Sequence, residues 1–222
     1  MIFLLEAIPM TKKERVATVI ELLREAYPDA VCALQYTHDY ELLFATRLSA
    51  QCTDARVNMV TKDLFVRFPT LESFAEAPIE DIEDGIKTCG LFHTKARDLK
   101  ACAQMLLSDF GGKVPDNMEE LLKLPGIGRK TANLILGDIY GKPAVVTDTH
   151  CIRLSNRLGF VKDEKDPVKV ETALRKLLPP AESSDFCHRL VLHGRECCTA
   201  RAPHCQTCCL ATVCPSFPMG KK

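Results

Sequence analysis

Apolar residues recur at helical spacing along almost the whole chain, and this pattern limits the fold more than any other feature. Val16, Val19, Ile20 and Leu23 lie three or four positions apart, which places them on one face of a helix. Similar stripes follow: Val57, Val60 and Leu64; Ala96, Leu99, Ala103 and Leu106; Ala132, Ile135, Leu136 and Ile139; and Val170, Leu174, Leu177 and Leu178. The strongest strand signal, residues 144–146, is too short to seed a sheet. The sequence therefore predicts an all-α fold.

Helix ends can also be read from the sequence at two places. Asp116 followed by Glu119 predicts a capping box that opens a helix over residues 118–124. Asp166 followed by Pro167 predicts a helix that begins with proline at its first position, and residues 179–180, both proline, would end it.

The bulk composition is that of an ordinary globular protein. The chain has 222 residues, of which 46% are hydrophobic and 26% charged, enough for one large or two small domains. Its net charge of zero does not by itself indicate a nucleic-acid binder, so a DNA-binding role requires basic residues gathered on one face. The apolar stretch at residues 2–8 is too short to span a bilayer and lacks the basic start of a signal peptide. We therefore expect a soluble, cytoplasmic protein.

Twelve cysteines are many for a protein expected in a reducing compartment, where disulfides are rare and metal binding explains most cysteine clusters. Six of them crowd between Cys197 and Cys214. The other six stand among apolar neighbours, and we expect them to be small buried hydrophobes: Cys32, Cys52, Cys89, Cys102, Cys151 and Cys187.

A Pro-Gly-Ile-Gly turn at residues 125–128 separates two predicted helices. Gly126 and Gly128 lack Cβ atoms, so the backbone can turn tightly and approach a ligand closely. The second helix should begin near Gly128, where unpaired N–H groups and the positive end of the helix favour a phosphate. The turn alone is equally compatible with a plain helix–helix connection, but the adjoining Arg129 and Lys130 favour phosphate binding.

Two segments carry a family resemblance. Residues 124–133, Leu-Pro-Gly-Ile-Gly-Arg-Lys-Thr-Ala-Asn, and residues 146–150, Val-Thr-Asp-Thr-His, resemble the active-site segments of the endonuclease III family. This family consists of helix–hairpin–helix DNA glycosylases with abasic-site lyase activity. The resemblance implies that Lys130 is the nucleophile, that Asp148 is its partner and that His150 contacts DNA.

The chemistry expected of Lys130 can be stated independently. An amine that attacks the sugar C1′ forms a Schiff base, and β-elimination of the 3′-phosphate then cuts the strand. The amine must be neutral to attack, and we expect partial burial and the positive end of a helix to favour the neutral form. Asp148 would favour the charged form, so its useful role is to accept a proton or to stabilise positive charge on the sugar.

The resemblance extends to residues 48–54, Leu-Ser-Ala-Gln-Cys-Thr-Asp, and residues 86–92, Ile-Lys-Thr-Cys-Gly-Leu-Phe. It implies that Gln51 fills the space left by a flipped nucleotide and that Leu91 wedges into the duplex. A polar plug and an apolar wedge suit the hole that base flipping leaves. Without the resemblance, both would be read as ordinary residues at helix ends.

Four cysteines near the end of the chain have the spacing C-x6-C-x2-C-x5-C: Cys198, Cys205, Cys208 and Cys214. Four thiolates suit a soft metal centre, and spacing alone leaves zinc as a competitor. This spacing is the signature of a [4Fe–4S] cluster in the family, which favours iron–sulfur. We expect the cluster to be structural and Cys197 and Cys209 to be non-ligands.

The resemblance covers nearly the whole chain and implies two helical domains that flank a DNA-binding cleft. Residues 32–142 would form the hairpin domain, residues 11–31 and 143–222 the iron–sulfur domain, and residues 1–10 a disordered extension. The predicted function is removal of damaged, oxidised pyrimidines from duplex DNA by a monomer that also cuts at the abasic site. The alternatives are a glycosylase without lyase activity, against which Lys130 argues, and a non-catalytic, zinc-stabilised DNA-binding module.

Overall fold

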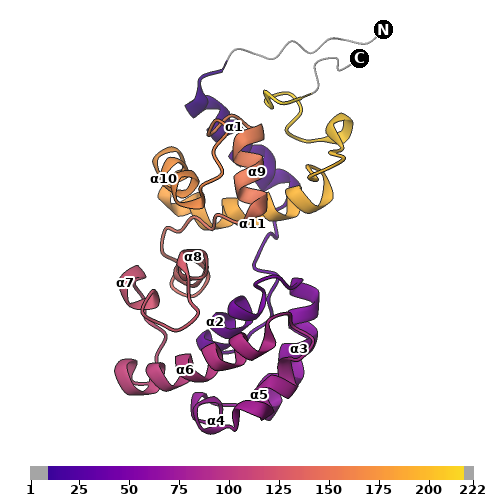
Figure 1. Ribbon diagram of the computed structural model, residues 1–222. Helices are drawn as coiled ribbons and strands as arrows, with labels where there is room; N and C mark the ends of the chain where they lie inside the picture. Colours follow the sequence, from indigo (N-terminus) through magenta and orange to yellow (C-terminus); the bar gives the residue numbers. More distant parts are fainter. Residues whose placement is uncertain (1–9, 218–222) are drawn as a thin grey trace. The chain divides into compact units, whose positions relative to one another are not determined.

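The computed structural model describes residues 10–217, and every regular element within that range is helical. The described chain divides into two compact units (Figure 1). Unit 1 holds the described residues up to Val31 and those from Lys142 onward, and unit 2 spans Cys32–Gly141. The predicted all-α class is confirmed. The predicted extension at residues 1–10 lies outside the described residues, apart from Met10.

Unit 2 contains seven helices in the order α2 (Asp39–Leu48), α3 (Asp54–Arg67), α4 (Leu71–Glu76), α5 (Ile79–Ile86), α6 (Phe92–Phe110), α7 (Met118–Leu121) and α8 (Arg129–Asp138). The long helix α6 packs against α2, α4 and α5, while α8 packs against α2 and α7. The predicted stripe of α6 is buried as expected, and Phe44 and Phe68 pack edge-on or tilted around Phe74 in the same core.

Unit 1 contains four α-helices and two short 3₁₀ turns: α1 (Lys12–Ala26), α9 (Thr149–Arg157), α10 (Pro167–Leu177), η1 (Pro180–Glu182), α11 (Ser183–Glu196) and η2 (Cys205–Thr207). Helix α11 packs against α1 and α9. The predicted apolar stripe of α1 is fully buried. Residues 144–146 are buried and form no strand.

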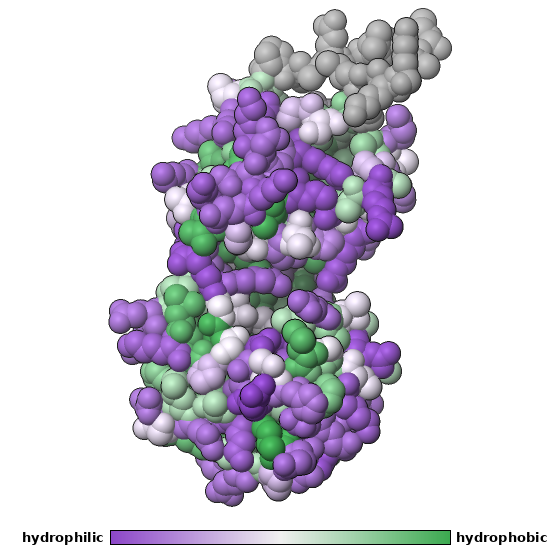
Figure 2. All heavy atoms as spheres, in the orientation of Figure 1, coloured by the Kyte–Doolittle hydropathy of each residue, from purple (hydrophilic) through white to green (hydrophobic). Residues whose placement is uncertain are grey.

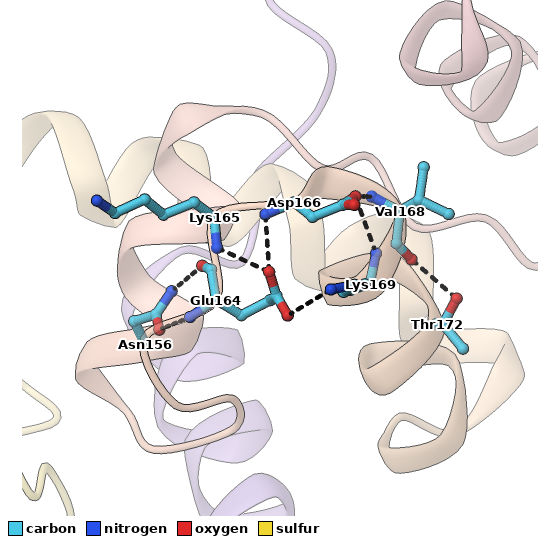
Figure 3. Close-up of polar contacts among 7 residues, drawn as sticks. All are labelled: Asn156, Glu164, Lys165, Asp166, Val168, Lys169 and Thr172. Atoms are coloured by element: carbon cyan, nitrogen blue, oxygen red, sulfur yellow. Dashed lines mark hydrogen bonds and ion pairs between the residues drawn. The ribbon is translucent and has the colours of Figure 1, made fainter.

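Side-chain caps fix the connection between α9 and α10 (Figure 3). Asn156 at the end of α9 accepts from the Glu164 amide and donates to its carbonyl. The Glu164 carboxylate accepts from the amides of Lys165 and Asp166, and Asp166 in turn caps α10 by accepting from Val168 and Lys169. The predicted start at Asp166–Pro167 is therefore confirmed.

Other local predictions need correction. Helix α7 is capped one residue later than predicted, because the Asn117 side chain accepts from the Glu120 amide, and the helix ends at Leu121. The shift arises because Asn117 offers a cap as good as that of Asp116 and is followed by an acidic residue at the same spacing. Three predicted stripe residues are only half-buried, since they lie at the rims of their helices: Val60, Ile139 and Leu177.

Polar side chains dominate the visible surface, with small apolar areas between them (Figure 2). None of the helices within residues 10–217 is long and apolar enough to cross a membrane. Of the six scattered cysteines, four are buried as predicted, while Cys32 and Cys52 are half-buried.

Candidate functional site

The hairpin of unit 2 is anchored by two apolar side chains and exposes its glycines. Leu124 and Ile127 are buried, and the Ile127 amide donates to the Leu124 carbonyl at 3.2 Å. Gly128 is the N-cap of α8 and supplies no side-chain cap, as predicted for a helix that begins there. Because the cap position carries no side chain, the start of α8 can receive an external acceptor.

The two hairpin glycines are required for different reasons. Gly126 has φ +73°, and a Cβ there would lie 2.6 Å from both Arg47 Nε and Asp98 Oδ2. These two side chains form a partly buried ion pair with an N–O distance of 2.6 Å. Gly128 has φ −102°, and a Cβ would meet nothing within 4 Å. The fold therefore demands glycine at Gly126, whereas the space beside Gly128 is open to solvent.

Lys130 lies in the first turn of α8, directly after the glycine cap. Its side chain is exposed, as is that of Arg129. The expectation of partial burial is thus wrong within the described structure, because the apolar face of α8 begins only at Ala132.

Asp148 caps helix α9. Its Oδ1 accepts from the Cys151 amide at 2.7 Å, and the residue is half-buried and follows the buried residues 144–147. This capping role of Asp148 was not predicted from the sequence, although Asp before a helix is a recognised N-cap signal. The cap holds the carboxylate in one orientation.

His150 lies in the first turn of α9, close to α11. Its Nδ1 is 3.2 Å from Arg153 Nη2, and a Cβ on Gly194 would lie 2.5 Å from the same nitrogen. Burial lowers the pKa of His150, and the positive charges of Arg153 and Arg195 lower it further. The negative charge of Asp148 acts in the opposite direction. Gly194 thus allows α9 and α11 to approach, and the imidazole is held nearly neutral at pH 7.

Gln51 and Leu91 occupy unusual backbone conformations in neighbouring segments of unit 2. Gln51 has φ 54° and is exposed, while Leu91 has φ 61° and is 59% exposed. A Cβ on Gly90 would lie 3.8 Å from the Gln51 carbonyl, so the two segments lie side by side. A left-handed conformation costs a residue with a side chain about 1–2 kcal/mol, so it is maintained by the surroundings.

The four predicted ligand cysteines line one cavity of about 100 Å³ in unit 1, together with Cys197 and Arg157. Four thiols around one cavity fit a soft metal centre. Within residues 10–217, the three metal-binding atoms found within 4.8 Å of one another belong instead to His193, Cys197 and Cys208. The predicted set is therefore spread more widely than ligands of a single ion.

Hydrogen bonds around Cys208 favour its thiolate. The Cys209 thiol, His193 and the Leu210 amide together hold the pKa of Cys208 well below its usual value. The buried His193 is itself oriented by Tyr27, whose hydroxyl lies 3.2 Å from His193 Nδ1. Thiolate is the form of cysteine that binds metal.

Two arginines of α9 hold the cysteine loop, and neither was predicted from the sequence. Arg157 donates to the Cys198 sulfur at 3.1 Å and to the carbonyls of Thr199 and Ala200. Arg153 donates to the carbonyls of Gly194 and Cys198. Their spacing of four residues on one helix face was visible in the sequence, but their partners lie more than 40 residues away and only the fold brings them together.

The comparisons agree with this geometry. Residues 44–180 match the profile of the HhH-GPD superfamily of base excision DNA repair proteins. The chain is 44% identical over 207 residues to endonuclease III of Synechocystis, covering 93% of this chain and 94% of that one, and 38% identical over 205 residues to endonuclease III of Bacillus subtilis, covering 92% and 94%. A solved structure of a trapped endonuclease III–DNA covalent intermediate, with an estranged adenine, superimposes with a TM-score of 0.89 at 40% identity, covering 94% and 98% of the two chains.

The helical fold, the glycine hairpin before a lysine-bearing helix and the matched profile define a base-excision-repair glycosylase of the HhH-GPD class. Within that class, the chain belongs to the endonuclease III family. The predicted activity, a bifunctional DNA glycosylase and abasic-site lyase for oxidised pyrimidines, is confirmed, and the alternatives without lyase activity or without catalysis are set aside.

Proposed function

We propose that Lys130 is the nucleophile of both reactions. The position of Lys130 supports this assignment. Its amine is exposed in the first turn of α8, two residues after the Gly128 cap, and the open space beside that cap would admit a DNA phosphate. A phosphate bound there would bring the sugar of the damaged nucleotide within reach of the amine. The related covalent intermediate with DNA supports a covalent route for this chain as well.

The proposed reaction consumes only water, which hydrolyses the Schiff base after strand cleavage and frees Lys130. The lone pair of Lys130 Nζ attacks C1′ as the bond from C1′ to the base breaks, and the base leaves with that electron pair and takes up a proton. Opening of the sugar ring gives a Schiff base between Nζ and C1′. Loss of a C2′ proton then expels the 3′-phosphate, which cuts the strand.

In this proposal Asp148 acts on the sugar of the same nucleotide. Its Oδ1 is oriented by the cap on α9, and its negative charge stabilises the positive charge that develops as the base departs or accepts the proton that the attacking amine releases. His150, in the first turn of α9, would contact the DNA backbone.

We further propose that unit 2 holds duplex DNA containing a damaged base or an abasic site. The α8 N-terminus with Gly126, Gly128 and Arg129 would bind the phosphate backbone without reading its sequence. Gln51 would fill the vacated space and Leu91 would wedge between base pairs, as their exposure and side-by-side segments allow. Residues 32–142 would thus be the hairpin domain, and the rest of the described chain the cluster domain.

The four cysteines Cys198, Cys205, Cys208 and Cys214 would hold a [4Fe–4S] cluster. Their thiols line a single cavity, Cys208 is held toward its thiolate form, and Arg157 places an N–H group on the Cys198 sulfur. When bound, the cluster would supply four metal–sulfur links that order a loop poor in apolar residues.

Covalent trapping tests the catalytic assignment. The protein is incubated with duplex DNA that carries one oxidised thymine, borohydride is added, and a shifted band reports the reduced Schiff base. We expect Lys130→Gln to lose the band and Lys123→Gln to keep it, because Lys123 is an exposed lysine of the same hairpin whose amine pairs with Glu119. Trapping by the Lys130→Gln variant would disprove the assignment.

Iron content tests the ligand set. Cys208→Ser and Cys214→Ser should lose most of the iron and visible absorbance of the purified protein, whereas Cys209→Ser and Cys197→Ser should keep them. Cys197 is the sharper control, since it lines the same cavity as the proposed ligands. Loss of iron in Cys197→Ser alone would move the first ligand from Cys198 to Cys197, and stoichiometric zinc in the wild type would contradict the cluster.

A further inference from the structure

Lys95 is a completely buried lysine whose polar partners are backbone carbonyls. Its exposed fraction is 0%, and its Nζ donates to the carbonyls of Leu48 at 2.8 Å and Ala50 at 2.7 Å. Burial lowers the pKa of Lys95 because water no longer solvates the ammonium. Burying a cation is unfavourable unless its N–H groups are satisfied, so these two bonds are the reason the ammonium can remain there.

The carbonyls that Lys95 binds belong to Leu48, the last residue of α2, and to Ala50, two residues beyond the helix. Carbonyls at this end of a helix have no partner within the helix and carry its partial negative charge, which suits a cation. The Ala50 carbonyl is part of the peptide unit that joins Ala50 to Gln51. By holding that peptide unit, Lys95 restrains the backbone of Gln51 at its left-handed φ of 54°.

Lys95 also belongs to the segment that presents Leu91. Its backbone amide donates to the Leu91 carbonyl at 3.1 Å, in the first turn of α6. One residue therefore holds Leu91 through its main chain and the Gln51 segment through its side chain.

The Cys89 thiol does not neutralise the charge of Lys95. Cys89 lies two residues before Leu91, and Cys52 lies next to Gln51. Burial raises the pKa of Cys89 to about 11, so this thiol is neutral at physiological pH. The bonds from Lys95 to the two carbonyls are thus the charged link between the segments.

We propose that Lys95 is a positioning residue that keeps Gln51 and Leu91 ready to enter the duplex before DNA binds. This inference rests on the roles proposed above for Gln51 and Leu91. Residues with side chains keep a left-handed conformation only where the surroundings impose it. Gln51 and Leu91 both have this conformation, and Lys95 links the two segments that contain them. Binding is tighter when the contacting groups need no reordering.

The test uses cluster-loaded protein and two duplexes, one undamaged and one with a tetrahydrofuran abasic-site analogue opposite 2-aminopurine. Fluorescence of the 2-aminopurine reports the base displaced when the plug and the wedge enter. Lys95→Met keeps the length of the side chain and removes its donors. In Lys95→Met we expect Gln51 and Leu91 to be correctly arranged in only roughly one molecule in ten. The apparent Kd for the abasic duplex then rises about tenfold, and the gain in 2-aminopurine fluorescence on binding shrinks. Binding to undamaged duplex, which depends on phosphate contacts, should stay within about twofold.

Lys100→Met is the matched control. Lys100 lies on the same helix and its Nζ donates to the Ala77 carbonyl at 2.8 Å, away from both segments. It should lower stability without changing either affinity. If Lys95→Met does not load its cluster, Lys95→Gln, which keeps a shorter donor, is measured instead and should show a smaller loss of the same kind.

A double-mutant cycle separates positioning from general stability. In a Gln51→Ala, Leu91→Ala background, Lys95→Met should cause little further loss for the abasic duplex, because the groups that it positions are already gone. A full additional tenfold loss in that background would overturn the proposal, as would unchanged affinity and fluorescence in Lys95→Met alone. If the Gln51→Ala, Leu91→Ala protein binds the abasic duplex like wild type, the roles proposed for those two residues fail, and this inference fails with them.

Discussion

The two hairpin glycines should separate stability from DNA binding when each is replaced by alanine. Gly126 has φ +73° and packs against the Arg47–Asp98 ion pair, whereas Gly128 has φ −102° and faces open space. Gly126→Ala should therefore destabilise the protein, and Gly128→Ala should weaken DNA binding with little effect on stability.

The magnitudes follow from the geometry. At Gly126 the left-handed backbone costs alanine about 1 kcal/mol, and displacing a partly buried ion pair costs about 1 kcal/mol more. A loss of about 2 kcal/mol lowers the Tm by roughly 4–8 °C for a chain of this size. Alanine at Gly128 makes the unfolded chain less flexible, which stabilises the folded state by about 0.5–1 kcal/mol. Alanine is also a poorer helix cap, which destabilises it by about the same amount, so the net change in stability is small.

The effect of Gly128→Ala on binding comes from the added methyl group. It would occupy the side of the helix cap from which a phosphate approaches. Loss of one hydrogen bond to a charged group, about 1.5 kcal/mol, weakens binding roughly tenfold. The assays are thermal unfolding of cluster-loaded protein and DNA affinity at several fixed salt concentrations.

Three outcomes would refute this reasoning. A Gly128→Ala protein that unfolds several degrees below wild type would show that the fold itself needs glycine there. A Gly128→Ala protein that binds DNA as tightly as wild type would show that no phosphate approaches the cap closely. Wild-type stability in Gly126→Ala would contradict the packing argument for that position.

Three further predictions concern unit 1. Asp148→Asn should remove activity while keeping the α9 cap and the free energy of unfolding, whereas Asp148→Ala should remove both and cost about 1 kcal/mol in urea unfolding; equal stability of the two variants would contradict the cap. Arg157→Lys keeps the charge but loses most of its bonds to the cysteine loop, so hydrogen exchange at residues 197–214 should accelerate, and unchanged protection would show that these bonds are dispensable. Because burial lowers the pKa of His150 from 6.5, the folded state takes up its proton less readily than the unfolded state, so stability should fall as the pH drops below about 6.5. His150→Asn should flatten that part of the pH–stability curve, and an unchanged curve would exclude His150 as the cause.

Local sequence signals were sufficient for some of these features. The stripe of α1, the Asp166–Pro167 start of α10 and the glycine cap of α8 all depend on residues within one or two turns of each other, so spacing alone predicts them. The start of α7 was missed by one residue because two adjacent residues offer competing caps of similar strength, and single-residue spacing does not decide between them.

The sequence by itself determined the helical class, the family and the candidate residues, because these reside in periodicity and in short motifs. Only the tertiary structure decided how those residues are held. Arg157 reaches carbonyls more than 40 residues away, Gly126 is required by an ion pair formed by two other helices, and Lys95 joins segments 45 residues apart. Such contacts depend on how helices pack, and helix packing depends on many weak apolar contacts that no local pattern records.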